Sequence, residues 1–260
     1  MNYTGEYEFE FDDHLGGYSA QLICACEELI FPCEYDGFKV LSIWADDSGA
    51  GNKQSVKRVV VPKGILNLEG PLFECFTSLE TVEISSSVKY ISSDAFMCCS
   101  SLKEFKVSPH NEHYTSIDGN LYSKDGSVLV CLALGQIGEC FNVPEFVKVI
   151  APSAFAHSKI SDVILPEGVV EIGENAFNAC SALRRVIIPN SVQKIDDFAF
   201  AYCSSLEVVF IPKTVEQIGY CLFLESNFEL KILCEAKKKK PNWDSGFAEE
   251  FTPIWGVKRT

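Results

Sequence analysis

The sequence lacks the features that mark several classes of protein. No run approaches the roughly 20 apolar residues that a membrane helix needs, so we expect no membrane insertion. Cations are scarce, because 22 Lys and Arg stand against 36 Asp and Glu, for a formal net charge of −14. This is the wrong sign for a chain that binds phosphates along its surface, so we expect no nucleic acid partner.

The start of the chain, MNYTGEYEFEFDD, is acidic where a signal peptide would be basic and then apolar. As written, the chain is therefore expected to be cytoplasmic. It would be a cell-surface or secreted protein if an export signal had been removed.

Catalytic and metal-binding motifs are also missing. The sequence contains no G-x-S-x-G, G-x-x-x-x-G-K-[ST], G-x-G-x-x-G or H-E-x-x-H, so we expect no enzyme and no cofactor. His110, Glu112 and His113 lie together, and a metal would have two imidazoles to use. An exposed polar turn beside a proline explains these residues equally well, so we expect no metal site.

What the sequence does contain is a repeat of 23 residues. The blocks LPEGVVEIGENAFNACSALRRVI, IPNSVQKIDDFAFAYCSSLEVVF and IPKTVEQIGYCLFLESNFELKIL align on Pro166, Pro189 and Pro212. The same phase runs back through Ser85 and Pro62, and six units are in phase. Since repeats of this kind bury their apolar faces by stacking on one another, the sequence predicts a solenoid.

Each repeat is predicted to contain one strand and one turn. Leu206, Val209 and Ile211 end in a two-residue alternation of strand-forming residues, and the following Pro212 stops the strand. An Ala-Phe pair, such as Ala199-Phe200, sets a small residue beside a large one, which suits a tight helical turn with one ring in the core. We therefore expect a parallel sheet along one side and short helical or irregular turns along the other.

The recurring pattern V-x-x-I-G-x-x-A-F-x-x-C-x-x-L-x-x-V-x-I-P resembles the BspA-type leucine-rich repeat over about residues 30 to 235. The resemblance implies a repeat solenoid of the α/β or mostly-β class: a right-handed leucine-rich-repeat coil with a parallel concave sheet, short helical turns opposite and a β-hairpin insertion. It also implies binding to other proteins and, in exported members, adhesion to host or neighbouring-cell surfaces.

The sequence predicts a single leucine-rich-repeat domain over residues 1–260. We expect an N-terminal β cap (1–29), repeats (30–107), a β-hairpin insertion (108–143), repeats (144–235) and a C-terminal cap (236–260). The insertion is indicated by Asp118-Gly119 and Asp125-Gly126, which flank strand-forming segments. The C-terminal cap is expected to bury Trp243, Phe247 and Trp255.

Twelve cysteines raise the question of disulfides or zinc. Cys99, Cys180 and Cys203 share one repeat slot, which reads as buried and small, and no C-x-x-C motif is present. Free buried thiols are therefore expected. A bond between Cys180 and Cys203 would still be allowed, because stacked strands are about 4.8 Å apart.

The candidate binding site is on the concave face of the solenoid, where strand residues on either side of each inward valine face solvent. In the C-terminal half these slots are predicted to form an apolar ridge with a charged rim: Ile164, Arg185, Ile187, Val208, Phe210 and Leu233. Such a ridge favours a protein partner or a second copy of the chain. The competing interpretation is that strand propensity alone selects these residues, or that the C-terminal segment or a second copy covers them.

Two classes of function remain open. The first is a non-enzymatic protein–protein interaction module. The second is a cell-surface adhesin-type or glycan-binding protein, or a glycan-processing one in which Asp162, Glu83 and Glu104 would line the concave groove. Paired catalytic carboxylates need separations of about 5 to 10 Å and a raised pKa on one of them, and the sequence supplies neither.

Overall fold

The computed structural model describes residues 3–45, 53–136 and 138–258. The chain divides into two compact units, the first with residues 1–125 and 131–136 and the second with residues 126–130 and 137–260. Regular structure is almost entirely β, and the described part of the chain has two short 3-10 helices, η1 (Lys53–Ser55) and η2 (Leu134–Gln136). None of the helices in the described ranges has the length and apolar character to cross a membrane.

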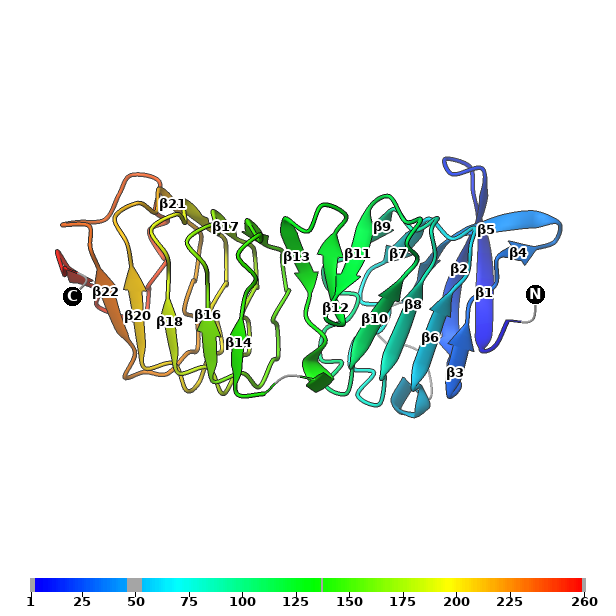
Figure 1. Cartoon of the computed structure of the whole chain (residues 1–260), viewed down its shortest axis with the longest axis horizontal. Coiled ribbons are helices and arrows are strands. Elements are labelled where there is room, and N and C mark those ends of the chain that lie inside the picture. Colours follow the sequence, from blue (N-terminus) through cyan, green and yellow to red (C-terminus); the bar gives the residue numbers. More distant parts are fainter. Residues whose placement is uncertain (1–2, 46–52, 137, 259–260) are drawn as a thin grey trace. The chain divides into compact units, whose positions relative to one another are not determined.

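The first unit contains two sheets and a hairpin (Figure 1). One sheet runs β1-β2-β5-β7-β9 with β4 beside β5, and the other, parallel, runs β10-β8-β6-β3. Strands β11 and β12 form an antiparallel hairpin. The bounds are β1 Glu6–Asp12, β2 Gly17–Cys24, β3 Glu28–Ile30, β4 Glu34–Tyr35, β5 Phe38–Trp44, β6 Arg58–Val61, β7 Asn67–Glu69, β8 Thr81–Ile84, β9 Tyr90–Ile91, β10 Glu104–Val107, β11 Tyr114–Ile117 and β12 Asn120–Ser123.

The second unit is a stack of coils with two rows of parallel strands. The longer strands form a sheet in the order β14-β16-β18-β20-β22-β23, and the shorter ones pair in the order β13-β15-β17-β19-β21 (Figure 1). The bounds are β13 Val128–Cys131, β14 Cys140–Asn142, β15 Val149–Ile150, β16 Asp162–Ile164, β17 Glu171–Ile172, β18 Arg185–Ile187, β19 Lys194–Ile195, β20 Val208–Ile211, β21 Gln217–Ile218, β22 Lys231–Cys234 and β23 Ile254–Trp255.

The phenylalanine of each Ala-Phe pair is in the core, as the sequence predicts. In the second unit, the rings of Phe155, Phe177, Phe200 and Phe223 stack coil upon coil, with centroids 4.6, 5.2 and 6.0 Å apart. The residue before each ring is buried and takes part in coil-to-coil pairing, since the backbone N–H groups of Phe177 and Phe200 donate to the carbonyls of Ala199 and Leu222 in the next coil at 2.8 and 3.0 Å. Aromatic stacking and backbone pairing therefore follow the same period.

The short strands are a feature that the sequence analysis did not anticipate. Four coils of the second unit have a second, two-residue strand (β15, β17, β19 and β21), whose inward residues lie in the register Ile150↔Ile172↔Ile195↔Ile218. Two residues are too few for a pattern of alternation to be visible in the sequence.

The turns are built from residues with left-handed backbone conformation rather than from helices. In the second unit, His157, Ala179, Tyr202 and Glu225 occupy one repeat slot, and all have φ between 51° and 62°. The N–H groups of the first three donate to carbonyls of the next coil at 2.7 to 2.9 Å. These turns thus form a third hydrogen-bonded ladder, in which the left-handed residues aim their N–H groups along the stack.

The repeated cysteine slot is buried, and it also carries a hydrogen bond. The thiols of Cys99, Cys180 and Cys203 each donate to the carbonyl of a phenylalanine in the preceding coil at 3.1 to 3.2 Å, and in the last repeat Ser226 does the same with its hydroxyl. Four of the repeats thus fill this slot with a small hydrogen-bond donor, whereas Phe76 fills it with a buried ring in an earlier repeat. The eleven cysteines whose side chains are described are free.

The hairpin within residues 108–143 has the expected turn. Asp118 and Gly119 both have positive φ, 49° and 77°, as a two-residue type I′ hairpin requires. At the C-terminus, Trp243 and Phe247 are buried, whereas Trp255 is only half-buried because it lies on the edge strand β23. The single domain over residues 1–260 and its inner boundaries stay a prediction.

Candidate protein-binding face

Five apolar side chains stand in register across the longer strands of the second unit. The register joins Ile164, Ile187, Phe210, Leu233 and Ile254 on β16, β18, β20, β22 and β23, and we call this set the apolar row. Because side chains alternate along a strand, Val163, Val186 and their equivalents point into the core while the row faces outward. Ile164 and Ile187 are 57% and 48% exposed, and Phe210 and Leu233 are half-buried.

A second row runs beside the first on the same face. It contains Cys140, Asp162, Arg185, Val208 and Lys231 in register. Arg185 and Asp162 are neighbours across β18 and β16, and the guanidinium Nε lies 3.0 Å from the carboxylate Oδ1. Val208 is half-buried and continues the apolar surface between Arg185 and Lys231.

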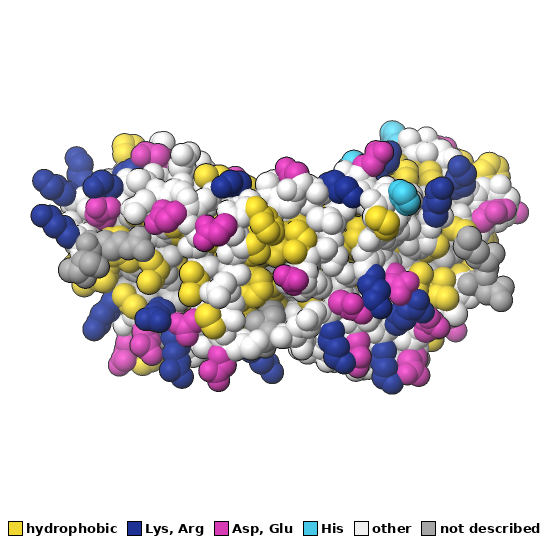
Figure 2. Space-filling view, viewed as in Figure 1, with side chains coloured by type: hydrophobic (Ala, Val, Ile, Leu, Met, Phe, Trp, Pro, Cys, Tyr) yellow, Lys and Arg dark blue, Asp and Glu magenta, His cyan; other side chains and the backbone are white. Residues whose placement is uncertain are grey.

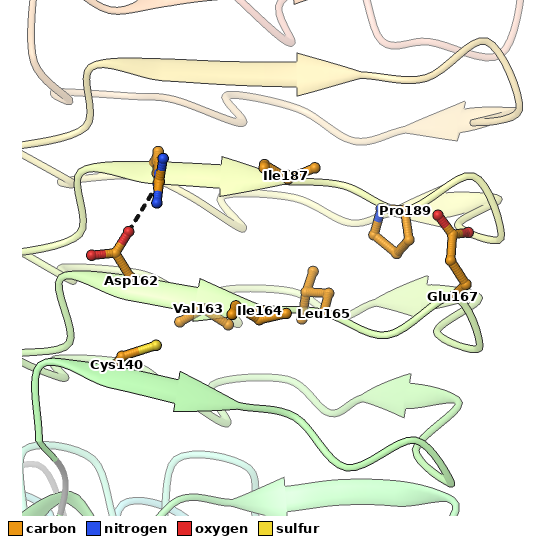
Figure 3. Close-up of a pocket in the computed structure, with 9 residues that line it drawn as sticks. Cys140, Asp162, Val163, Ile164, Leu165, Glu167, Ile187 and Pro189 are labelled. Atoms are coloured by element: carbon orange, nitrogen blue, oxygen red, sulfur yellow. Dashed lines mark hydrogen bonds and ion pairs between the residues drawn. The ribbon is translucent and has the colours of Figure 1, made fainter. Parts of the chain in front are cut away.

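The two rows border a hollow of about 460 Å³ between β14, β16 and β18. Ile164, Leu165, Ile187 and Pro189 give it apolar walls (Figure 3). The Asp162–Arg185 ion pair lies at one end of the hollow and Glu167 at the other. A cavity that is apolar inside and charged at its ends is typical of a pocket for an apolar side chain.

The equivalent face of the first unit carries more charged side chains. On the sheet of β3, β6, β8 and β10, Arg58 bonds the carboxylates of Glu28 and Glu83, and Lys106 lies 2.9 Å from Glu104. Figure 2 shows Lys and Arg beside Asp and Glu over these strands, and hydrophobic side chains interspersed with charged ones over the strands of the second unit. The slots equivalent to the apolar row hold Ile30, Val60, Glu83 and Lys106 in the first unit, so that row is interrupted by charge, whereas the row of the second unit is apolar throughout.

The structure places all six residues of the sequence-based site on this one sheet: Ile164, Arg185, Ile187, Val208, Phe210 and Leu233. It adds Ile254, which the sequence analysis missed because β23 lies outside the repeats and carries no periodic signal. The C-terminal segment extends the sheet at its edge by pairing with β22. The row is thereby lengthened by one side chain.

The three carboxylates of the glycan alternative are all engaged by basic side chains. Glu83 and Glu104 belong to the first unit and Asp162 to the second, and each is held in an ion pair. Within the described residues, no three His, Cys, Asp or Glu side chains are grouped to hold a metal ion.

The sequence matches the family described as BspA type Leucine rich repeat region, in six copies over residues 50–128 and 138–239. The chain belongs to this family. No curated protein matches it.

Solved bacterial structures share the fold. The pneumococcal vaccine antigen PcpA has a TM-score of 0.59 at 17% identity, over 90% of this chain and 81% of that one. A leucine-rich repeat protein from Eubacterium ventriosum has a TM-score of 0.55 at 16% identity, over 90% and 77%. One from Bacteroides ovatus has a TM-score of 0.51 at 21% identity, over 88% and 58%.

The protein is thus a leucine-rich-repeat solenoid of a family whose repeats form interaction or surface modules and are generally not enzymes.

Proposed function

We propose that the protein is a non-enzymatic protein–protein interaction module that binds through the apolar row of the second unit. One observation carries this proposal: the outward row of the second unit is apolar on five successive strands, whereas the equivalent row of the first unit is interrupted by Glu83 and Lys106. Strand propensity alone acts equally on both units, so it does not account for the difference. A row of exposed Ile beside half-buried Phe and Leu, with Arg at its rim, has the composition of a protein contact.

The test replaces part of the row by the chemistry of the first unit. Ile164→Lys with Ile187→Glu puts opposite charges on adjacent strands at register positions, as Lys106 and Glu83 stand on β10 and β8. The net charge is unchanged, and both side chains are largely exposed, so the thermal midpoint should stay within a few degrees. The matched control is Phe228→Glu, at an 88% exposed phenylalanine outside the sheet.

Binding is measured in two ways: self-association by sedimentation, and capture of proteins from the source cells, compared between variants by mass spectrometry. We expect the wild type and the Phe228 variant to retain the same partner or dimer and the double variant to lose it. Unchanged binding by a folded double variant would exclude the row as the site. Retained binding to saccharides on a glycan array would favour the glycan-binding alternative.

A further inference from the structure

We infer that Cys75 and Cys98 form a redox modification site, in which a peroxide-class oxidant joins the two thiols as a disulfide between adjacent coils of the first unit. Three observations support this site: the places of the two cysteines in their coils, the contact between their side chains, and their exposure to solvent. The site does not depend on the proposed function, because the apolar row belongs to the second unit.

The two cysteines occupy the same place in consecutive coils. They are 23 residues apart, and both have left-handed backbone conformation, with φ of 58° and 60°. The backbone N–H of Cys75 donates to the carbonyl of Met97 at 2.9 Å, so the two turns are paired directly. Equal conformations in paired turns aim the Cα–Cβ bonds in the same direction, about one strand spacing of 4.8 Å apart. This separation is within the range of about 4.4 to 6.8 Å between the Cα atoms of a disulfide.

The two side chains also contact each other. The Cys75 side chain is a hydrogen-bond partner of the Cys98 thiol. Burial and this hydrogen bond raise the pKa of Cys98, and the nearby carboxylate of Glu74 adds to the rise. The ammonium of Lys53, on η1, opposes it, and the neighbouring Gln54 donates to the carbonyl of Cys75 at 3.2 Å. The pair therefore has a second sulfur in reach of the first and a cation beside both.

Exposure distinguishes this pair from the cysteines of the core. Cys75 and Cys98 are half-buried, whereas Cys180 and Cys203 are buried. The buried pair is also 23 residues apart in adjacent coils, but its thiols donate to backbone carbonyls of the core. A small oxidant dissolved in water therefore reaches the first pair and not the second.

The fold does not require cysteine in this slot. In the second unit the equivalent left-handed slot holds His157, Ala179, Tyr202 and Glu225. Packing therefore does not explain cysteines in two consecutive coils. For the same reason, serine in place of either cysteine should leave the fold intact.

The reaction balances with hydrogen peroxide as the two-electron oxidant. The thiolate of one cysteine attacks a peroxide oxygen, the O–O bond breaks, and the released hydroxide takes up a proton to leave as water, so that this sulfur becomes a sulfenic acid. The other thiol then attacks that sulfur: the S–S bond forms, the S–O bond breaks, and the proton of the second thiol leaves with a second water. Two thiols and one peroxide thus give one disulfide and two waters. Because its raised pKa keeps Cys98 protonated, the first attack is assigned to Cys75.

The experiment uses the full chain, reduced, freed of reductant and treated with millimolar hydrogen peroxide. Remaining thiols are blocked, and tryptic peptides are analysed without reduction by mass spectrometry. Cleavage after Lys63, Lys89 and Lys103 places Cys75 alone in residues 64–89, and Cys98 with its neighbour Cys99 in residues 90–103. The variants Cys98→Ser and Cys99→Ser distinguish the two cysteines of the second peptide.

We expect the two peptides to be linked in the wild type and in Cys99→Ser, and the link to be lost in Cys98→Ser. In Cys98→Ser, Cys75 should instead accumulate as a sulfenic acid, which a dimedone probe labels. The matched internal control is the pair Cys180 and Cys203, whose peptides should be linked at least about 10-fold less.

Four results would overturn the inference. A link that persists in Cys98→Ser would assign the bond to Cys99, and one found only in a disulfide-linked dimer would assign it to two chains. Equal linkage of the Cys180 and Cys203 peptides would show that exposure does not select the pair. Recovery of Cys75 and Cys98 without any link, as blocked thiols or as sulfinic acids, would show that the two sulfurs do not react with each other.

Discussion

At the scale of single residues, the stacked phenylalanines are the positions where the repeat tolerates least change. Phe177 is fully buried and lies between the rings of Phe155 and Phe200, at 4.6 and 5.2 Å. Its replacement leaves a cavity that neither neighbouring coil is able to fill, since each is fixed by ladders of hydrogen bonds.

Phe177→Ala should therefore lower the free energy of unfolding by about 3 to 5 kcal/mol, through lost burial and the residual cavity. Urea denaturation followed by circular dichroism measures the change. Phe228→Ala, at the 88% exposed phenylalanine, is the control and should shift stability by less than about 0.5 kcal/mol. If Phe177→Ala lowered the free energy of unfolding by less than about 1 kcal/mol, the Phe177 ring would not be an essential part of the core.

The cysteine slot links stability to pH. Burial raises the pKa of the Cys180 thiol from 9.0 to about 11, and the hydrogen bond from Ser158 partly opposes this rise. The folded state thus keeps its proton over a range in which the unfolded chain loses it. Its contribution to stability is complete below about pH 9 and declines as the pH rises to about 11.

Cys180→Ser should remove this decline, because a serine hydroxyl does not titrate in that range and makes the hydrogen bond that Ser226 makes in the last repeat. Relative to its own value at pH 7, the wild type should lose up to about 3 kcal/mol more than the variant by pH 11. Urea titrations at pH 7, 9 and 11 measure how the free energy of unfolding of the wild type and of the variant depends on pH. Parallel curves would show that this thiol does not titrate differently in the two states.

At the scale of the element, the turns contain residues in a strained, left-handed backbone conformation that no sequence pattern predicts. Ala179 has φ of 55°, a conformation that costs a residue with a Cβ about 1 kcal/mol or more. Its backbone N–H donates a hydrogen bond to the carbonyl of Ala201. Ladder hydrogen bonds on both sides stabilise the strained conformation.

Ala179→Gly should raise stability by about 0.5 to 1 kcal/mol, since glycine adopts this conformation without the Cβ penalty, less its own entropic cost. The control is Ala156→Gly, at a buried alanine of a neighbouring turn without positive φ, which should lower stability by about 1 kcal/mol. Thermal unfolding of the two variants shows whether each substitution raises or lowers the stability of the protein. Destabilisation at both positions would mean that the side chain of Ala179 matters more than its backbone.

How much of these elements is visible in the sequence depends on the kind of signal. The longer strands, the Ala-Phe core and the hairpin at Asp118-Gly119 are predictable, because alternation, residue size and turn chemistry each leave a pattern. The left-handed slot is filled by His157, Ala179, Tyr202 and Glu225, which share no side-chain chemistry, so no pattern marks it. The same is true of Ile254 in the candidate site, whose place in the apolar row depends on how the C-terminal segment pairs with β22.

At the scale of the whole molecule, the C-terminal segment closes the second unit. The carbonyls of Gly246 and Phe247 accept the N–H groups of Cys221 and Leu222, and the indole N–H of Trp243 donates to the carbonyl of Val215. The segment thus takes the place of a further coil, and covers the last repeat with Trp243 and Phe247.

Removal of residues 241–260 should lower the free energy of unfolding by more than about 4 kcal/mol, because two buried aromatic side chains and several hydrogen bonds are lost. Hydrogen exchange should accelerate first in β21 and β22, which border the exposed coil. Removal of residues 256–260 alone is the control and should leave those amides protected. Uniform acceleration through both units would show that the segment stabilises the chain globally rather than its last coils.

The ladder of left-handed turns also bears on how such a chain is lengthened in evolution. The N–H groups of the left-handed residues His157, Ala179 and Tyr202 donate to carbonyls of the next coil in the chain. Each of these coils therefore accepts hydrogen bonds from the coil before it and donates to the coil after it. A gene duplication of one whole repeat, such as residues 190–212, inserts a coil with both edges already matched to its neighbours. A duplication that is not a whole number of repeats would shift the hydrogen-bonding groups of the inserted coil out of register with its neighbours. Each duplicated repeat therefore lengthens the sheet by one strand, or about 4.8 Å, and adds outward-facing residues that are free to diverge.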